Sequence, residues 1–179
     1  MLVNAYAAAA AGEPLVPTTV TRREVGSNDV LIKIEYAGIC HSDIHTVRGD
    51  WGPQPFPVTP GHEIIGTVVE AGADVTNHKV SDRVGVGCMV NSCRECSNCR
   101  NDDEQYCLNG TVFTYASADR DGTATQGGYS THVVVDADFV LKVPDGIASA
   151  EAAPLLCAGI TTYSPLQHWG AGPGKRVAI

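Results

Sequence analysis

The chain has 179 residues, 44% of them hydrophobic, and carries a net charge of −8 because 20 Asp and Glu outnumber 12 Lys and Arg. A chain of this size can bury one core and form one domain, and its acidic balance argues against a surface that binds nucleic-acid phosphates. No apolar stretch reaches the roughly 20 residues needed to span a bilayer. We therefore expect a cytoplasmic globular protein with neither a nucleic-acid nor a membrane partner.

The first eleven residues are mostly apolar and resemble the apolar region of a secretory signal. They lack a basic region in front of them, however, and run directly into Pro14 and Pro17. We interpret this segment as the start of a first strand rather than as a signal.

Six short segments rich in β-branched and apolar residues, bounded by Gly, Pro, Asn or Asp, predict strands. They cover residues 2–6, 30–37, 63–70, 83–86, 129–135 and 139–143. Glycines at 61, 66 and 72 flank or interrupt the third segment, which predicts sharp turns or the close approach of another backbone. The polar run 116–126 is expected to be a surface loop. The pattern predicts a mainly β fold with short helices, arranged as a barrel or sandwich.

The character of the chain changes after residue 143. Ser149 can cap a helix that starts near Ala150 and continues to residue 157, and a second helix is expected over 162–169. A glycine-rich turn over 170–176 then leads into residues 177–179, which are typical of the opening of an apolar strand. We expect one domain over 1–150, followed over 151–179 by a helical connection and the first strand of a second domain that the chain does not contain.

Four cysteines lie within fifteen residues as CxxCxxCx(7)C, namely Cys93, Cys96, Cys99 and Cys107. Thiolates at this spacing can converge on one tetrahedral ion, so the loop 88–108 is predicted to hold a structural zinc. Chance clustering and a redox dithiol are the alternatives, but no βαβ pattern surrounds the loop as in thioredoxin-like proteins. Disulfides are disfavoured because the seven cysteines are an odd number and the chain lacks export features.

A second set comprises Cys40, His62 and Cys157, which are far apart in sequence. Two cysteines and one histidine form a known set for catalytic zinc with an open fourth position. Spacing alone leaves the ordinary alternatives open, since an isolated buried cysteine often acts as a small hydrophobic residue and an isolated histidine often belongs to a turn. The seventh cysteine, Cys88, is excluded as a ligand and interpreted as a buried thiol.

Five short motifs occur one after another along the chain. They are GICHSDIH at 38–45, PGHE at 60–63, GVGC at 85–88 before the four-cysteine loop, GGY at 127–129, and LLCAGITTY at 155–163. In this order they resemble the zinc-dependent medium-chain alcohol dehydrogenases, and most closely the branch of cinnamyl alcohol dehydrogenases and broad-range aldehyde reductases. The resemblance implies a GroES-like β-barrel catalytic domain that carries both zinc sites, with a Rossmann domain that would follow residue 179.

The resemblance also implies roles for individual residues. Cys40, His62 and Cys157 would bind the catalytic zinc, and Glu63 would rotate in as an alternative ligand. Asp43 would orient the zinc-binding histidine, as carboxylates commonly do; otherwise it would cap the helical turn after Cys40.

Further roles concern proton transfer and cofactor contact. Ser42 would bond the reacting oxygen, although a serine here also suits a helix N-cap, and His45 would pass the proton to solvent. His41 would contact a cofactor phosphate, Thr161 the nicotinamide ring, and Trp51 would form a wall of the substrate pocket.

These implications give a functional hypothesis for the intact protein. It would be a zinc-dependent NADP(H) alcohol dehydrogenase or aldehyde reductase, a homo-oligomer with two zinc ions per chain, acting on a small-molecule alcohol or aldehyde. The fragment alone would be inactive, because no GxGxxG turn for a dinucleotide is present. The alternative is a non-catalytic zinc-binding GroES-like module, and a truncated enzyme is favoured over it.

Overall fold

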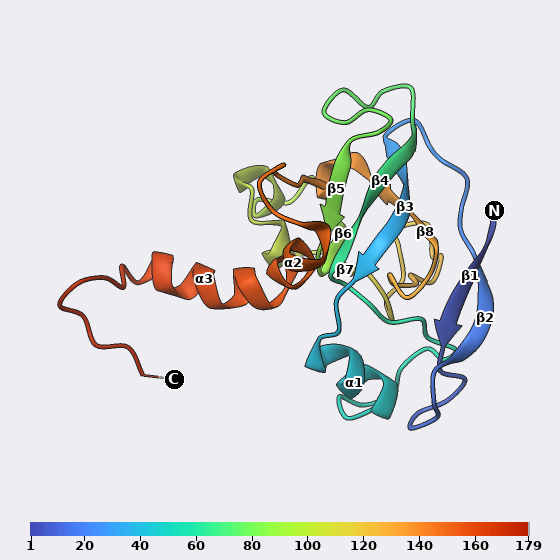
Figure 1. Ribbon diagram of the computed structural model, residues 1–179, viewed down its shortest axis with the longest axis horizontal. Coiled ribbons are helices and arrows are strands. Elements are labelled where there is room, and N and C mark those ends of the chain that lie inside the picture. The colour runs from blue at the N-terminus through green and yellow to red at the C-terminus, as the bar shows by residue number, and fades with distance from the viewer. Residues whose placement is uncertain (179) are drawn as a thin grey trace.

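The computed structural model describes residues 1–178, which form a β body from which one helix extends (Figure 1). Its largest sheet has five antiparallel strands in the order β8-β3-β4-β5-β9. These strands are β3 (Asp29–Ala37), β4 (Ile64–Ala71), β5 (Arg83–Val86), β8 (His132–Asp136) and β9 (Leu141–Lys142). The mainly β fold is therefore confirmed.

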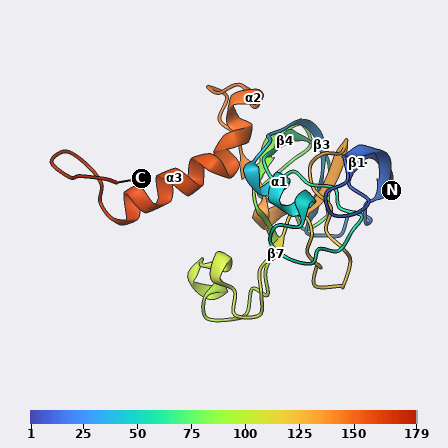
Figure 2. The same cartoon turned by 90° about the horizontal axis from the view of Figure 1, so that it is seen from below.

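Two smaller sheets complete the body. β1 (Leu2–Ala7) pairs with β2 (Val16–Thr21), and β6 (Met89–Asn91) pairs with β7 (Val112–Phe113). The segment between β6 and β7 forms a separate lobe at one side of the molecule, with the short 3-10 turns η1 (Cys99–Asn101) and η2 (Glu104–Tyr106) (Figure 2). This lobe contains the four-cysteine loop.

The core lies where alternate residues of the large sheet point to the same side. Val133 and Val135 of β8 are buried while their neighbours are not, as expected for a strand with one covered face. They pair in register with Ile32 and Val30 of β3, which are fully buried. Burying each such side chain contributes on the order of 2 kcal/mol, so these residues fix the register of the sheet.

The glycines around β4 lie where other chain segments come close. A Cβ at Gly66 would stand 2.2 Å from the Lys33 carbonyl oxygen, and one at Gly72 would stand 2.1 Å from the carbonyl of Gly26. Gly61 has a φ of +100°, which L side chains rarely adopt. The expected close approaches and turn are confirmed.

The helices follow strands of the large sheet and lie outside it. α1 (His41–Arg48) follows β3, while α2 (Ser149–Ala152), η4 (Ala153–Leu156) and α3 (Ala158–His168) follow η3 (Ala137–Phe139) and β9. α3 projects away from the strands (Figures 1 and 2), and residues 161–170 are all exposed. Within residues 1–178, no helix has the length and hydropathy required to cross a membrane.

Some predicted bounds are wrong. The strand expected over 129–135 begins at His132, because Tyr129 instead bonds its N–H to the Pro60 carbonyl and its own carbonyl to the N–H of Tyr6. Ser149 is the first residue of α2 rather than its cap; Ala148 is the N-cap, and the Ser149 hydroxyl lies 3.4 Å from Glu35 Oε2.

Other differences concern the ends and loops. The second helix begins at Ala158 rather than at 162, and residues 177–178 form no strand, while Ile179 lies outside the described residues. The polar run 116–126 folds back on itself, with a bridge between Ala118 and Ala124. The short strands β2, β6 and β7 were not predicted.

Candidate metal centres

Three separate segments bring Cys40, His62 and Cys157 together. Cys40 is the N-cap of α1, His62 lies just before β4, and Cys157 lies between η4 and α3. Their ligand atoms lie within 4.8 Å of one another, and the two sulfurs are 3.8 Å apart. The structure therefore groups the three residues that the sequence proposed for catalytic zinc.

Asp43 connects two of these residues. Its Oδ1 accepts hydrogen bonds from the Gly61 N–H at 2.9 Å and from His62 Nδ1 at 3.1 Å, and its Oδ2 accepts one from the Cys40 N–H at 3.0 Å. This arrangement leaves Nε2 of His62 available to a metal, as in other carboxylate-histidine pairs. The placement supports the orienting role proposed for Asp43.

The electrostatics of this pair follow from the contacts. Burial raises the pKa of Asp43, but hydrogen bonds from His62 and the Cys40 N–H outweigh it and hold the pKa below its usual value. Conversely, burial lowers the pKa of His62, and the bond to Asp43 outweighs it and raises that pKa. The carboxylate therefore stays ionised beside the histidine.

The two cysteines of this cluster differ in their surroundings. Burial raises the pKa of Cys40, but the hydroxyl and N–H of Ser42 outweigh it and lower that pKa. Burial and the neighbouring Cys88 raise the pKa of Cys157. A cation between the sulfurs would stabilise both thiolates, so the donor set fits zinc.

Glu63 is buried but does not belong to the ligand cluster. Its Oε1 accepts a hydrogen bond from the Ala158 N–H at 3.3 Å, next to Cys157. A Cβ at Gly38 would collide with its carboxylate. In this arrangement Glu63 supports the segment that carries Cys157, and the alternative ligand role is not adopted.

A cavity of about 450 Å³ opens beside the cluster. Ser42 and Trp51 line it together with His62 and Cys157, and Ser42 Oγ lies 3.5 Å from Cys40 Sγ. Cys88 also lines this cavity and is half-buried. Ser42 and Trp51 thus both border the cavity beside the cluster.

His45 lies at the outer side of α1. Its Nδ1 is 2.8 Å from Asp50 Oδ2, and its ring centroid is 4.7 Å from that of His41 and 5.2 Å from that of Trp51. His41 is exposed, and Thr161 is exposed on the first turn of α3. The structure therefore brings Ser42 to the cluster and leaves His41 and Thr161 exposed.

Two tyrosines near the cluster received no role from the sequence. Tyr115 is buried, with its ring centroid 5.4 Å from that of His62, and Tyr129 bonds Asp43 through its hydroxyl at 3.1 Å. The GGY motif contained Tyr129, but no sequence signal indicated that its side chain reaches a residue 86 positions away.

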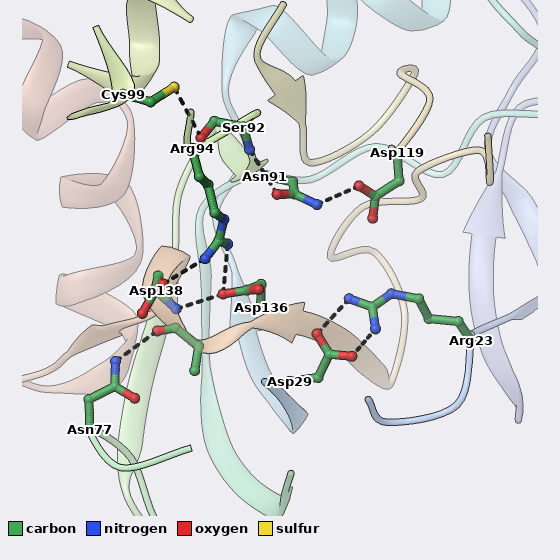
Figure 3. Close-up of polar contacts among 11 residues, drawn as sticks. Arg23, Asp29, Asn77, Asn91, Ser92, Arg94, Cys99, Asp119, Asp136 and Asp138 are labelled. Atoms are coloured by element: carbon green, nitrogen blue, oxygen red, sulfur yellow. Dashed lines mark hydrogen bonds and ion pairs between the residues drawn. The ribbon is translucent and has the colours of Figure 1, made fainter. Parts of the chain in front are cut away.

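The four cysteines of the loop also converge, with ligand atoms within 4.8 Å of one another. Backbone N–H groups point at the sulfurs: that of Cys96 lies 3.4 Å from Cys93 Sγ, and that of Cys93 lies 3.4 Å from Cys107 Sγ. The Ser92 hydroxyl lies 3.4 Å from Cys99 Sγ (Figure 3). These contacts are typical of a closed thiolate site.

The thiols of this loop differ widely in pKa. Desolvation raises the pKa of Cys93, but N–H donors of Glu95 and Cys96 outweigh it and lower that pKa to about 6. The Ser92 hydroxyl lowers the pKa of Cys99, but burial and the Cys96 sulfur outweigh it and raise that pKa to about 11. Because four adjacent thiolates repel one another, a divalent cation is needed to ionise them together, and the set fits structural zinc.

A mainly β fold that carries one four-thiol cluster and one Cys-His-Cys cluster beside a cavity defines a domain with two candidate metal sites as the class. Residues 26–145 match the family described as Alcohol dehydrogenase GroES-like domain, and the chain belongs to this family.

The chain is similar to known proteins over nearly its whole length. It is 62% identical over 178 residues to NADP-dependent alcohol dehydrogenase C 1 of Mycolicibacterium smegmatis, covering 99% of this chain and 51% of that protein. It resembles the crystal structure of CAD from Helicobacter pylori complexed with NADP(H), with a TM-score of 0.95, 44% identity and coverage of 98% and 51%. A cinnamyl alcohol dehydrogenase from Sorghum bicolor gives a TM-score of 0.95 at 42% identity, with coverage of 98% and 50%. The chain spans about half the length of the relatives it matches.

Proposed function

We propose that this chain is the zinc-binding catalytic domain of an NADP(H)-dependent alcohol dehydrogenase or aldehyde reductase. The observation that carries the proposal is the Cys40, His62 and Cys157 cluster, which faces a cavity and presents three ligands rather than four. Three protein ligands with an open position are typical of catalytic zinc. The names of the relatives support the alcohol or aldehyde substrate and NADP.

The residues around the cluster have distinct proposed tasks. Cys40, His62 and Cys157 would hold a zinc ion, and that ion would act as a Lewis acid that polarises a carbonyl oxygen or lowers the pKa of an alcohol. Ser42 lines the cavity and would donate its hydroxyl proton to the substrate oxygen. His45, bonded to Asp50 and part-exposed, would take up a proton from solvent and return it to Ser42. Trp51 would contact the organic part of the substrate.

The four-cysteine loop would hold the second zinc, for a total of two per chain. We place the protein in the cytoplasm, where thiols stay reduced, and infer a homo-oligomer for the intact protein. Exposed apolar side chains on α3 and at its C-cap, such as Ile160, Tyr163 and Trp169, leave a surface for further protein to cover. Thr161 on the same helix and His41 on α1 are proposed cofactor contacts.

Metal stoichiometry tests the proposal. Elemental mass spectrometry should find two zinc ions per chain, and a mild chelator should remove one. The variant Cys157→Ala should retain one zinc, whereas Cys88→Ala should retain two. In the full-length M. smegmatis relative, the change equivalent to Cys157→Ala should abolish aldehyde reduction without unfolding the protein. A single, tightly held zinc in the unmodified chain would instead favour the non-catalytic zinc-binding module.

A further inference from the structure

The hydroxyl of Tyr129 contacts Asp43, and both residues line a pocket other than the cavity beside the metal cluster. Tyr129 Oη lies 3.1 Å from Asp43 Oδ2 and 3.3 Å from the Gly38 carbonyl oxygen. A phenol has one proton, and the carboxylate is both the nearer and the charged acceptor, so the proton is donated to Asp43. Tyr129 is not among the residues that line the cavity beside the cluster. Its role is therefore sought in its contact with Asp43 rather than in that cavity.

With this bond, Asp43 accepts four hydrogen bonds of 3.1 Å or less, and the Tyr115 hydroxyl also acts on its carboxylate. Oδ1 accepts hydrogen bonds from the Gly61 N–H and from His62 Nδ1, and Oδ2 accepts them from the Cys40 N–H and the Tyr129 hydroxyl. The Tyr129 hydroxyl is the only one of the four donors that belongs to neither ligand-bearing segment. Asp43 is buried, so its carboxylate depends on these donors for its orientation.

The backbone of Tyr129 is fixed on two sides. Its N–H bonds the Pro60 carbonyl at 3.0 Å, and its carbonyl accepts the Tyr6 N–H at 2.8 Å. The preceding Gly128 donates its N–H to the Gly61 carbonyl at 2.8 Å. A Cβ at Gly61 would stand 2.7 Å from the Tyr129 ring, so glycine there makes room for the ring. The segment that carries His62 and the ring of Tyr129 are thus held against each other.

We propose that Tyr129 is a positioning residue for the catalytic metal site, which acts by fixing the Asp43 carboxylate and thereby the His62 ring and the Cys40 backbone. The inference rests on the proposed metal site. Partners that orient metal-binding histidines commonly change metal affinity about 10- to 100-fold when removed. Tyr129 bonds Asp43 and not the histidine itself, so the effect should be smaller. We expect its hydroxyl to increase the metal affinity about three- to tenfold.

Cobalt(II) provides a test that does not depend on turnover. Zinc is kept in the four-cysteine loop, the other cluster is emptied with a mild chelator, and Co(II) is titrated while its visible d–d absorption is recorded. Tyr129→Phe should bind Co(II) about three- to tenfold more weakly and shift the bands. Tyr36→Phe is the matched control, because Tyr36 is an exposed tyrosine of the neighbouring β3, and it should behave as the unmodified chain.

The outcomes separate the two proposals. If the unmodified chain gives no tetrahedral Co(II) spectrum, the metal site itself is refuted, and this inference with it. If the unmodified chain binds Co(II) and Tyr129→Phe has the same affinity and bands, only the role of Tyr129 is overturned. Equal weakening by Tyr36→Phe would likewise overturn it.

A double-mutant cycle distinguishes positioning from general packing. If Tyr129 acts through Asp43, then removing its hydroxyl in an Asp43→Asn chain should cause no further loss of Co(II) affinity. An additive loss would contradict the proposal. If a phenylalanine or asparagine variant does not fold, 3-fluorotyrosine at position 129 alone retains the ring and the O–H while making the phenol more acidic. That change should shift the Co(II) bands, and unchanged bands would overturn the inference.

Discussion

Arg94 Nη2 lies 2.8 Å from Asp136 Oδ1, so an ion pair fastens the four-cysteine loop to the end of β8 (Figure 3). The other guanidinium nitrogen lies 2.6 Å from Asp138 Oδ2, and the group stands 5.3 Å from the centroid of the Phe139 ring. Arg94 sits between two zinc-ligand candidates and has a φ of +60°. A residue of the metal loop thus reaches back to the sheet.

Replacing Arg94 with alanine should loosen this attachment. The side chain is 38% exposed, so solvent screens the pairs, and we expect a loss of about 1 kcal/mol in the free energy of unfolding. Urea unfolding measures this loss, and limited proteolysis should cut the 93–107 loop sooner. Arg100→Ala is the control, because Arg100 lies in the same loop and is exposed. Equal behaviour of the two variants would contradict the role of Arg94.

Replacing Cys96 with serine should remove the structural zinc. A ligand that binds only the folded state at about 1,000 times its Kd stabilises that state by about 4 kcal/mol, and in a protein of this size each kcal/mol shifts Tm by roughly 2–4 °C. We therefore expect Tm to fall by about 10 °C and the zinc content by one ion per chain. Scanning calorimetry with elemental analysis measures both, and unchanged melting would remove the case for a structural site.

The sequence predicted the four-cysteine cluster because the ligands are local. Fifteen residues of chain bring the sulfurs together whatever the rest of the fold does. Cys40 and Cys157, in contrast, are 117 positions apart and meet at 3.8 Å only because β3 and η4 end at the same place. Spacing carries no signal for such a meeting, and only the resemblance to a family pointed to it.

The features that the sequence could not predict are those set by tertiary contacts. β2 contains Pro17, which disfavours a central strand, yet it forms because it pairs with β1 in a two-stranded sheet that leaves it an edge. Ser149 was a reasonable cap by residue type, but its hydroxyl is directed to Glu35 rather than to the helix. Tyr129 was assigned to a strand, whereas its hydroxyl contact with Asp43 depends on the whole sheet.

The ion pair between Arg23 and Asp29 predicts how stability depends on pH (Figure 3). Burial raises the pKa of Asp29, but hydrogen bonds from Arg23 and the Gly26 N–H outweigh it and lower that pKa below its unfolded value of about 3.9. The stabilisation is therefore fully present above that unfolded value and is lost as pH falls through the folded pKa.

Asp29→Asn should accordingly flatten the acid limb of the stability curve. Below about pH 4 the variant should lose less stability per pH step than the unmodified chain, while at pH 7 it should be the less stable of the two. Urea unfolding at a series of pH values measures the difference. Asp145→Asn serves as a control, because Asp145 is exposed. Parallel curves for Asp29→Asn and the unmodified chain would exclude the ion pair as a source of pH dependence.

Arg22 donates hydrogen bonds to four acceptors in the segment 126–132, which contains Tyr129, and none of the four is a carboxylate. It donates to the carbonyls of Gln126, Gly127 and His132 and to the Ser130 hydroxyl. The residue is buried, and burial lowers the pKa of its guanidinium to about 10, so it remains charged at neutral pH. A buried charge bonded only to neutral groups depends on every one of them.

Arg22→Met should therefore destabilise the chain by about 3 kcal/mol or more, since it leaves several carbonyls without donors. Arg22→Lys should recover only part of this loss, because an ammonium cannot span four acceptors as a planar guanidinium does. Urea unfolding of both variants, with Arg48→Met as an exposed arginine for comparison, measures the effect. Full recovery with lysine would show that the charge alone matters, whereas a graded series would show that the directed hydrogen bonds of the guanidinium stabilise this segment.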